Sequence, residues 1–176
     1  MDAIIYTSNT GTTKEYAFLL GKYTGLSVLS LKEAKDKVTK GSKIIYLGWV
    51  MAGKIQGYSK ATKQYKVKAV CGVCMGATGT QIPEIREKNR ISETVPVFSM
   101  QGGFDINKLH GIYKMMMTVM AKTAGKGLAE KTDRTPDEDM MLDMMLNGAN
   151  YVSENNMENL LDWYNSSSQR HNDGKE

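Results

Sequence analysis

The sequence predicts an α/β fold, a doubly wound parallel sheet of about five strands in the order 2-1-3-4-5 with helices on both faces. Short apolar segments alternate along the chain with segments of helical periodicity, which is typical of α/β proteins. The three clearest strands, at residues 3–7, 43–49 and 67–73, have runs of consecutive apolar side chains. Such runs indicate strands that helices cover on both faces. Among doubly wound folds, the 2-1-3-4-5 order fits this number of strands.

The remaining elements follow from periodicity and from the residues that start and end helices. Gly25 separates the first helix from the second strand, and Pro83 lies near the start of a helix. Thr135 is the expected N-cap of a later helix whose first residue is Pro136. The predicted strands are 3–7, 27–31, 43–49, 67–73 and 95–99, and the predicted helices are 12–24, 32–38, 57–65, 82–89, 107–123, 136–147 and 156–164.

Length and composition indicate one domain. The 176 residues, 41% of them hydrophobic, suffice for a single stable core at residues 1–164. Residues 165–176 are polar and are expected to form a disordered tail. No apolar run approaches the roughly 18–20 residues of a membrane span, and no secretory signal is evident at the N-terminus. With only two cysteines, the sequence predicts a cytoplasmic protein.

The charge of the chain is unevenly distributed. The net charge is +4, but residues 54–90 contain eight basic and two acidic side chains, whereas residues 131–163 contain two basic and eight acidic ones. This polarity indicates either an anionic partner near the middle of the chain or simply two solvated faces. No basic stripe is interleaved with aromatic residues, so nucleic-acid binding is not predicted.

The segment YTSNTGTTKEYA, residues 6–17, joins the first strand to the first helix. Five of the seven residues from Thr7 to Thr13 carry a hydroxyl group. Such a turn is either an ordinary capped helix start or a phosphate site, in which hydroxyls and free N–H groups of the helix bind the anion. Its spacing matches neither a nucleoside-triphosphate loop nor a dinucleotide loop. The predicted phosphate ligands are Ser8, Asn9, Thr10, Gly11, Thr12 and Thr13.

The motif SNTGTT resembles the Ser/Thr-x-Thr-Gly-x-Thr phosphate loop of flavodoxins, and it matches that loop at Ser8, Thr10, Gly11 and Thr13. The resemblance implies a flavodoxin-like fold with noncovalently bound FMN. It further implies that the segments after two later strands flank the flavin ring, with Trp49 as a candidate for ring stacking or for the core. The ring-flanking residues implied in this way are Trp49, Val50, Met51, Ala52, Gly53, Cys74, Met75, Gly76, Gly102 and Gly103.

Residues 99–127 are similar in outline to the flavodoxin-type, menaquinone-dependent protoporphyrinogen oxidases. The shared outline is a glycine-containing turn, Gly102 and Gly103, and then an aromatic and methionine-rich helix with lysines. In the helix 107–123, an apolar stripe either packs on the sheet or contacts a membrane or a flat hydrophobic substrate. The stripe consists of Leu109, Ile112, Tyr113, Met116, Met117 and Met120.

Other candidate motifs are set aside. Cys71 and Cys74 form a Cys-x-x-Cys motif at the end of a strand, where two residues three apart lie about 10 Å from each other, too far for a disulfide. The two histidines, His110 and His171, do not combine with either cysteine into a metal site. No catalytic residue and no metal ligand is therefore predicted.

The sequence thus predicts an FMN-binding redox protein, either an oxidoreductase or an electron carrier. Its partner would be a redox protein or a small molecule, with an anionic compound such as protoporphyrinogen, and a quinone acceptor, as the most specific version. Membrane association through residues 107–123 belongs to that version. The alternative function is a flavin-free module that uses the loop at residues 8–13 for another phosphate ligand.

Overall fold

The structure is a computed structural model of the whole chain. It describes residues 1–104, 108, 111–136, 138–139, 142–143 and 148–172. Within helix α5 it describes only some of the side chains, and from residue 168 to 172 it describes none.

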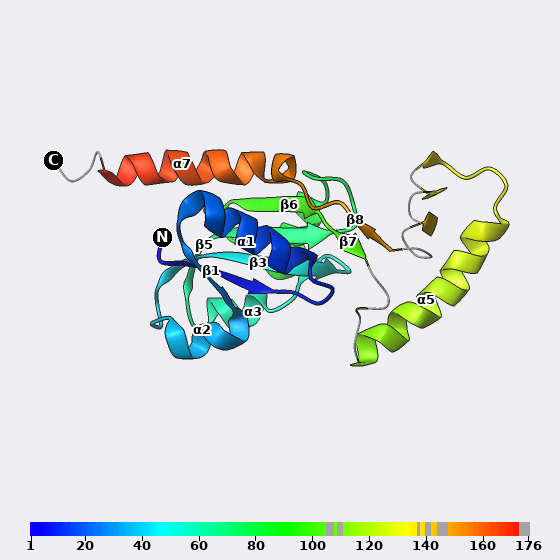
Figure 1. The fold of residues 1–176 in the computed structure, drawn as a ribbon, viewed down its shortest axis with the longest axis horizontal. Helices are drawn as coiled ribbons and strands as arrows, with labels where there is room; N and C mark the ends of the chain where they lie inside the picture. The colour runs from blue at the N-terminus through cyan, green and yellow to red at the C-terminus, as the bar shows by residue number, and fades with distance from the viewer. Residues whose placement is uncertain (105–107, 109–110, 137, 140–141, 144–147, 173–176) are drawn as a thin grey trace.

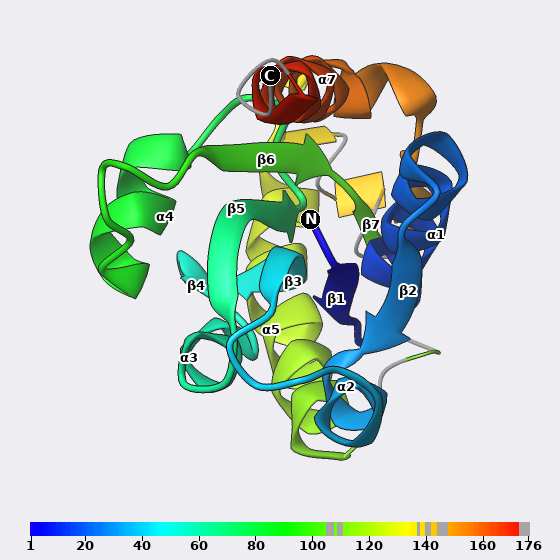
Figure 2. The same ribbon diagram turned by 90° about the vertical axis from the view of Figure 1, so that its left-hand side faces the viewer.

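A six-stranded sheet forms the centre of the protein (Figures 1 and 2). Five strands are parallel, in the order β2-β1-β3-β5-β6, and the short β4 pairs antiparallel with β3. The strands are β1 (Ala3–Thr7), β2 (Ser27–Ser30), β3 (Lys43–Met51), β4 (Lys54–Ile55), β5 (Lys66–Cys74) and β6 (Val97–Gln101). The structure confirms the α/β class and the parallel sheet. The observed order differs from the predicted 2-1-3-4-5 because the prediction contains no counterpart of β4, which lies between β3 and β5 in the chain.

Helices cover both faces of the sheet. On one face lie α2 (Leu31–Lys37), α3 (Tyr58–Thr62) and α4 (Ile82–Asn89), and on the other lie α1 (Thr12–Thr24) and α7 (Glu158–Asn172) (Figures 1 and 2). Successive side chains of β3 enter the two cores alternately: Tyr46 packs under α2 and α3, and Leu47 packs under α1 and α7. This alternation explains why β3 is apolar at consecutive positions.

The end of the chain differs from the prediction. The last predicted helix, 156–164, starts earlier as the 3₁₀ helix η2 (Glu154–Met157) and continues as α7 to Asn172. The disordered tail expected at residues 165–176 is therefore wrong up to Asn172, and residues 173–176 lie outside the described part of the chain. Met157 and Leu160 are buried in the core under α1 and α7. Together with the partly buried Leu161, Trp163 and Tyr164, they pack the first part of α7 against this core.

A long insertion separates β6 from η2. It begins at β7 (Gly103–Phe104) and ends at β8 (Ala149–Asn150). These two strands pair antiparallel, and we call the pair the neck of the insertion. The insertion carries α5 (Gly111–Glu130), which lies beyond the carboxyl ends of the strands and outside both helical layers (Figure 1). Helix α5 is thus not one of the helices that cover the sheet, contrary to one of the two alternatives for the predicted helix 107–123.

The predicted apolar stripe of α5 falls on side chains outside the described residues. The described side chains of this helix include two exposed apolar ones, Met115 and Val119, which are 63% and 56% exposed. Lys114 and Lys122 are exposed on the same helix. Within the part of the chain that the structure describes, no helix has both the length and the apolar character needed to cross a bilayer.

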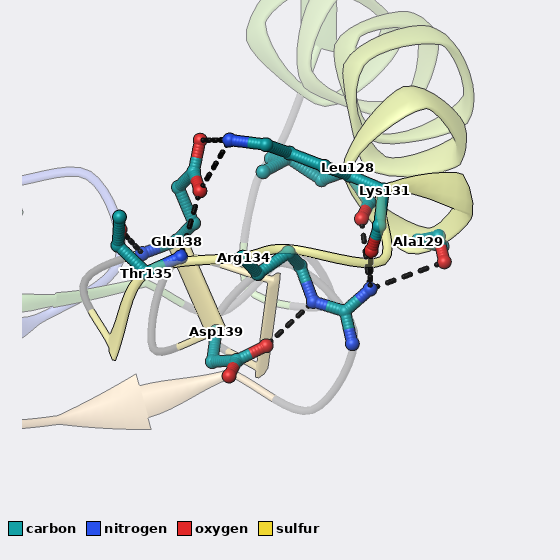
Figure 3. Close-up of polar contacts among 7 residues, drawn as sticks. All are labelled: Leu128, Ala129, Lys131, Arg134, Thr135, Glu138 and Asp139. Atoms are coloured by element: carbon teal, nitrogen blue, oxygen red, sulfur yellow. Dashed lines mark hydrogen bonds and ion pairs between the residues drawn. The ribbon is translucent and has the colours of Figure 1, made fainter.

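Polar contacts fix the turn that follows α5 (Figure 3). Arg134 Nη1 donates to the carbonyl oxygens of Leu128, Ala129 and Lys131, the free acceptors at the end of a helix. Its Nε donates to Asp139. The N–H of Glu138 donates to Thr135 Oγ1 and that of Thr135 donates to the Glu138 carboxylate, a capping box that confirms Thr135 as a helix cap.

We expect Glu138 to titrate below the ordinary glutamate range. Lys131 Nζ lies 2.8 Å from both carboxylate oxygens. The hydrogen bonds from Lys131 and then from the Thr135 N–H lower the pKa of Glu138 from 4.5. Because the folded pKa is depressed, this contact stabilises the fold above the unfolded pKa, and the stabilisation is lost as the pH falls through the folded pKa.

Carboxyl chemical shifts followed by NMR across this pH range test the expectation. The variant Lys131→Met should raise the pKa of Glu138 toward 4.5. A wild-type value at or above 4.5 would contradict the ion pair.

Candidate functional site

The hydroxyl-rich loop at residues 8–13 lies at the carboxyl end of β1, where it leads into α1. Strand β1 pairs with β2 on one side and β3 on the other. The strand order reverses at this position: from β1 the chain adds β2 on one side of the sheet, and it then crosses to the other side to form β3. In open parallel sheets, ligands bind beside the carboxyl ends of the strands at such a switch point. The fold therefore places the loop where a ligand site is expected.

The loop does not cap its own helix with a side chain. The N-cap of α1 is Gly11, in the left-handed region with φ 109, and no side chain donates or accepts a capping hydrogen bond there. Ser8 Oγ accepts a hydrogen bond of 3.2 Å from the Gly11 N–H within the loop. The first N–H groups of a helix without a side-chain cap are available to water or to a ligand. This arrangement counts against the interpretation of residues 8–13 as an ordinary capped turn.

Two buried polar atoms of the loop lack partners. Among the residues that the structure describes, Thr13 Oγ1 and Asn9 Nδ2 make no hydrogen bond although both atoms are buried. Thr13 is only 1% exposed. A buried hydroxyl without a partner costs about 1–3 kcal/mol. Unpaired donors at a switch point indicate a binding site in which a ligand supplies the missing acceptor.

A buried tyrosine, Tyr46, contacts Thr7, the residue that precedes the loop. The Tyr46 hydroxyl donates to the Gln56 carbonyl oxygen at 2.8 Å and lies 2.7 Å from Thr7 Oγ1, the last residue of β1. Burial raises the pKa of Tyr46 to about 12, although the hydrogen bond with Thr7 lowers it in part. Tyr46 therefore stays neutral and links the end of β1 to the segment that follows β4.

The first predicted ring-flanking segment is a β-hairpin rather than an open loop. Strand β3 continues through Trp49, Val50 and Met51, and Met51 pairs with Lys54 of β4. The two turn residues, Ala52 and Gly53, have φ values of 50 and 75, as a two-residue hairpin turn requires. Sequence reasoning missed this hairpin because the Asn-Gly or Asp-Gly pair that usually marks such a turn is absent.

Helix α4 holds the hairpin in place. Asn89 Oδ1 accepts a hydrogen bond from the Ile55 N–H at 2.9 Å, and its Nδ2 donates to the Gly53 carbonyl at 2.8 Å. Lys88 Nζ donates to the Ala52 carbonyl. Trp49 lines a cavity together with Ser8 and Asn9, so the structure brings this predicted residue to the loop. Val50 instead packs against the core under α4.

The second predicted ring-flanking segment follows β5. Cys74 is buried, and its thiol donates to the carbonyl oxygens of Gly76 and Met100. Burial raises the pKa of Cys74, so the thiol stays protonated. The loop then folds over the end of β6, where Thr78 Oγ1 accepts a hydrogen bond from the Gln101 N–H at 3.0 Å. Cys71 and Cys74 are both free.

Gly102 reaches the loop from β6. Its N–H donates to the Cys74 carbonyl at 2.7 Å, and a Cβ added at Gly102 would lie 3.2 Å from Thr12 Oγ1. Gly102 therefore lies next to Thr12 of the loop. Gly103 pairs with Asn150 in the neck of the insertion. The other predicted ring-flanking residues, namely Val50, Met51, Ala52, Gly53, Cys74, Met75, Gly76, Gly102 and Gly103, line neither of the two basic cavities described next.

Three cavities border the loop; the one along α1 includes Glu15 in its lining, and the other two are basic. The smaller of these two, of about 530 Å³, extends toward α2, and the larger, of about 960 Å³, extends along α3 and the hairpin to the end of α4. Thr7, Ser8 and Asn9 border both, and so does Lys60. Among the residues that the structure describes, no Asp or Glu lines either of these two. The basic charge of residues 54–90 was expected from the sequence. The contribution of Lys14, Lys32 and Lys35, which the fold brings to the smaller cavity, was not.

Tyr16, whose role was not predicted from the sequence, connects α1 by hydrogen bonds to the segments before and after the insertion. Tyr16 is fully buried, and its hydroxyl donates to the Gln101 carbonyl at 2.5 Å and accepts from Asn156 Nδ2 at 2.8 Å. Burial raises the pKa of Tyr16, and the hydrogen bond from Asn156 lowers it in part. Helix α1, the end of β6 and η2 are thereby joined next to the loop. No local motif marks this role, since its partners lie far apart in the sequence.

The basic lining and the unpaired donors of the loop make the arrangement suited to binding an anion. Among the described residues, no three His, Cys, Asp or Glu side chains are placed to hold a metal ion. Comparison of the chain with models of protein families, with curated proteins and with the solved structures finds no match.

Proposed function

We propose that this protein binds FMN noncovalently in a flavodoxin-like fold and acts as a redox protein. One observation carries the proposal: the hydroxyl-rich loop at the switch point neither caps its helix nor satisfies the buried Thr13 hydroxyl. The five parallel strands, in the order β2-β1-β3-β5-β6, support the flavodoxin-like assignment. The resemblance of residues 8–13 to the flavodoxin phosphate loop selects FMN among phosphate ligands.

Each part of the chain has a defined task in this proposal. Ser8, Thr10 and Thr13 donate hydroxyl hydrogens to the FMN phosphate, and Asn9 and Gly11 shape the loop around it. Trp49 and the hairpin turn at Ala52 and Gly53 flank the flavin on one side. The residues that flank it on the other side are Cys74, Met75, Gly76, Gly102 and Gly103. Bound FMN supplies one- or two-electron transfer, so no side chain has to act as acid or base.

The lining of the two basic cavities supports an anionic redox partner, either a protein or a small molecule. The most specific version is the oxidation of a flat, carboxylate-bearing porphyrinogen with a quinone as acceptor. Its support is the similarity of residues 99–127 to the protoporphyrinogen oxidases. In that version the exposed Met115 and Val119 of α5, with Lys114 and Lys122, contact an anionic membrane. Quinone-coupled oxidation of protoporphyrinogen by the purified protein separates such an enzyme from a pure electron carrier.

The cofactor is tested by titrating the purified protein with FMN while recording the visible absorption spectrum. Binding of one FMN per chain is the expected result. Failure to bind FMN would overturn the redox proposal and leave the alternative function, a flavin-free module whose loop binds another phosphate compound.

The variant Thr13→Val gives a sharper prediction. It removes the unpaired hydroxyl with little change in shape, so the protein without FMN should keep its free energy of unfolding or gain about 1 kcal/mol. The same change should weaken FMN binding about tenfold or more, because a hydrogen bond to a charged phosphate is lost. Denaturant unfolding and FMN titration measure the two quantities.

Thr24→Val is the matched control, since Thr24 lies at the other end of α1, where its hydroxyl donates to the Leu20 carbonyl at 2.8 Å. This variant should lose some stability and keep its FMN affinity. If Thr13→Val and Thr24→Val bind FMN equally well, the loop does not hold the phosphate.

A further inference from the structure

The larger cavity is a concave basic surface that the FMN proposal does not use in full. We name it the lysine groove and define it by Lys54, Lys60, Lys63, Lys88 and Arg90. These residues come from β4, from α3 and the turn after it, and from α4 and its end. The groove extends from Ser8 and Asn9 of the loop to Arg90. FMN carries one phosphate, which the loop binds, and this leaves the basic side chains farther along the groove without an anion.

Most of the positive charge in the groove is not neutralised by the chain itself. Lys88 pairs with Glu84 at 2.8 Å. For Lys54, Lys60 and Lys63, the described part of the chain contains no ion pair. The lining contains no acidic side chain from the described ranges of the chain. Like charges held together on a concave surface raise the local concentration of anions and favour their binding.

The shape of the groove distinguishes between kinds of anion. Its volume of about 960 Å³ lies within the range of sites for small molecules, roughly 300–1,000 Å³. Lysine is a common ligand of phosphate groups, and one end of the groove adjoins hydroxyl and amide side chains of the loop. An acidic protein face would instead be matched by a flat or convex surface with a polar rim.

We propose that the lysine groove binds a small molecule with several phosphate groups, at a site distinct from the FMN phosphate loop. The end at Lys63 and Arg90 binds the phosphates farthest from the loop. This inference does not depend on FMN binding, because the basic side chains that define the groove lie outside residues 8–13.

Tripolyphosphate is the probe, and its binding is measured by calorimetry at low salt with FMN-free protein and again after FMN is added. The test variant combines Lys63→Ser with Arg90→Asn; asparagine is chosen because Arg90 has a φ of 51, which asparagine tolerates. The control combines Lys66→Ser with Lys68→Asn, which removes the same charge from exposed positions of β5 that do not line the groove.

We expect the test variant to bind tripolyphosphate about tenfold or more weakly than wild type, while the control stays within about threefold. Both variants should keep the thermal midpoint and the FMN affinity of the wild type, and FMN should not displace the probe. Equal losses in the two variants would show an effect of net charge only and overturn the proposal. So would complete displacement by FMN, which would place the probe at the loop and Trp49 rather than at the end of the groove with Lys63 and Arg90. No binding to wild type would also overturn it and would favour an acidic protein as the partner.

Discussion

Replacing Gly57 by alanine is expected to lower the free energy of unfolding by about 2–4 kcal/mol. Gly57 follows β4 and has a φ of 83. A Cβ at this position would overlap the Tyr46 hydroxyl and lie 2.5 Å from Thr7 Oγ1. Both groups belong to the hydrogen-bonded contact that fixes the end of β1, so neither can move without loss of that contact.

Gly79 provides a matched control for this prediction. Its φ is also 83, but a Cβ added there would have no heavy atom within 4 Å. Gly79→Ala therefore carries only the backbone cost of a left-handed alanine, about 1 kcal/mol. Denaturant unfolding of both variants isolates the steric part of the Gly57 effect as their difference. Equal losses would show that the Tyr46 and Thr7 hydroxyls do not enclose Gly57.

The elements that sequence reasoning located best are those specified by local signals. Strand β1, helix α1 and helix α4 have the predicted bounds, because an apolar run, helical spacing and Gly25 or Pro83 mark their limits within a few residues. The loop at residues 8–13 was located for the same reason, since it must join β1 to α1. Such features need no knowledge of the rest of the chain.

Features that depend on distant residues could not be predicted. The Tyr46 hydroxyl meets Thr7 across 39 positions of the sequence, and no pattern around either residue indicates the other. The hairpin turn is stabilised by Asn89 of α4, which compensates for an alanine at a position that favours glycine or asparagine. The smaller basic cavity similarly combines Lys14, Lys35 and Lys60 from three separate helices.

The choice of the helix that closes the second face was also beyond sequence reasoning. Periodicity shows that a helix has an apolar side, but it does not show which surface that side meets. Both α5 and α7 follow β6 in the chain, and the methionine-rich α5 is the more apolar of the two. The structure nevertheless uses α7, whose Leu160 is 1% exposed in the core beside Leu20 of α1.

Substitution of Leu160 by alanine should accordingly destabilise the fold strongly. A buried leucine truncated to alanine loses about 2–4 kcal/mol from its own transfer and from the cavity that remains. Val119→Ala on α5 is the comparison, because Val119 is 56% exposed and its truncation should change the free energy of unfolding by about 0.5 kcal/mol or less. Denaturant unfolding of the full-length chain measures both.

The two variants together test which helix belongs to the core. If α7 covers the sheet, only Leu160→Ala shifts the unfolding midpoint, and FMN binding to that variant persists wherever the protein remains folded, because Leu160 does not line the loop. If Val119→Ala costs as much as Leu160→Ala, α5 packs against the sheet as a core helix. The surface of α5 would then be unavailable for a membrane or a substrate. The protoporphyrinogen-oxidase version of the proposed function would lose its docking helix, while the loop at residues 8–13 would be unaffected.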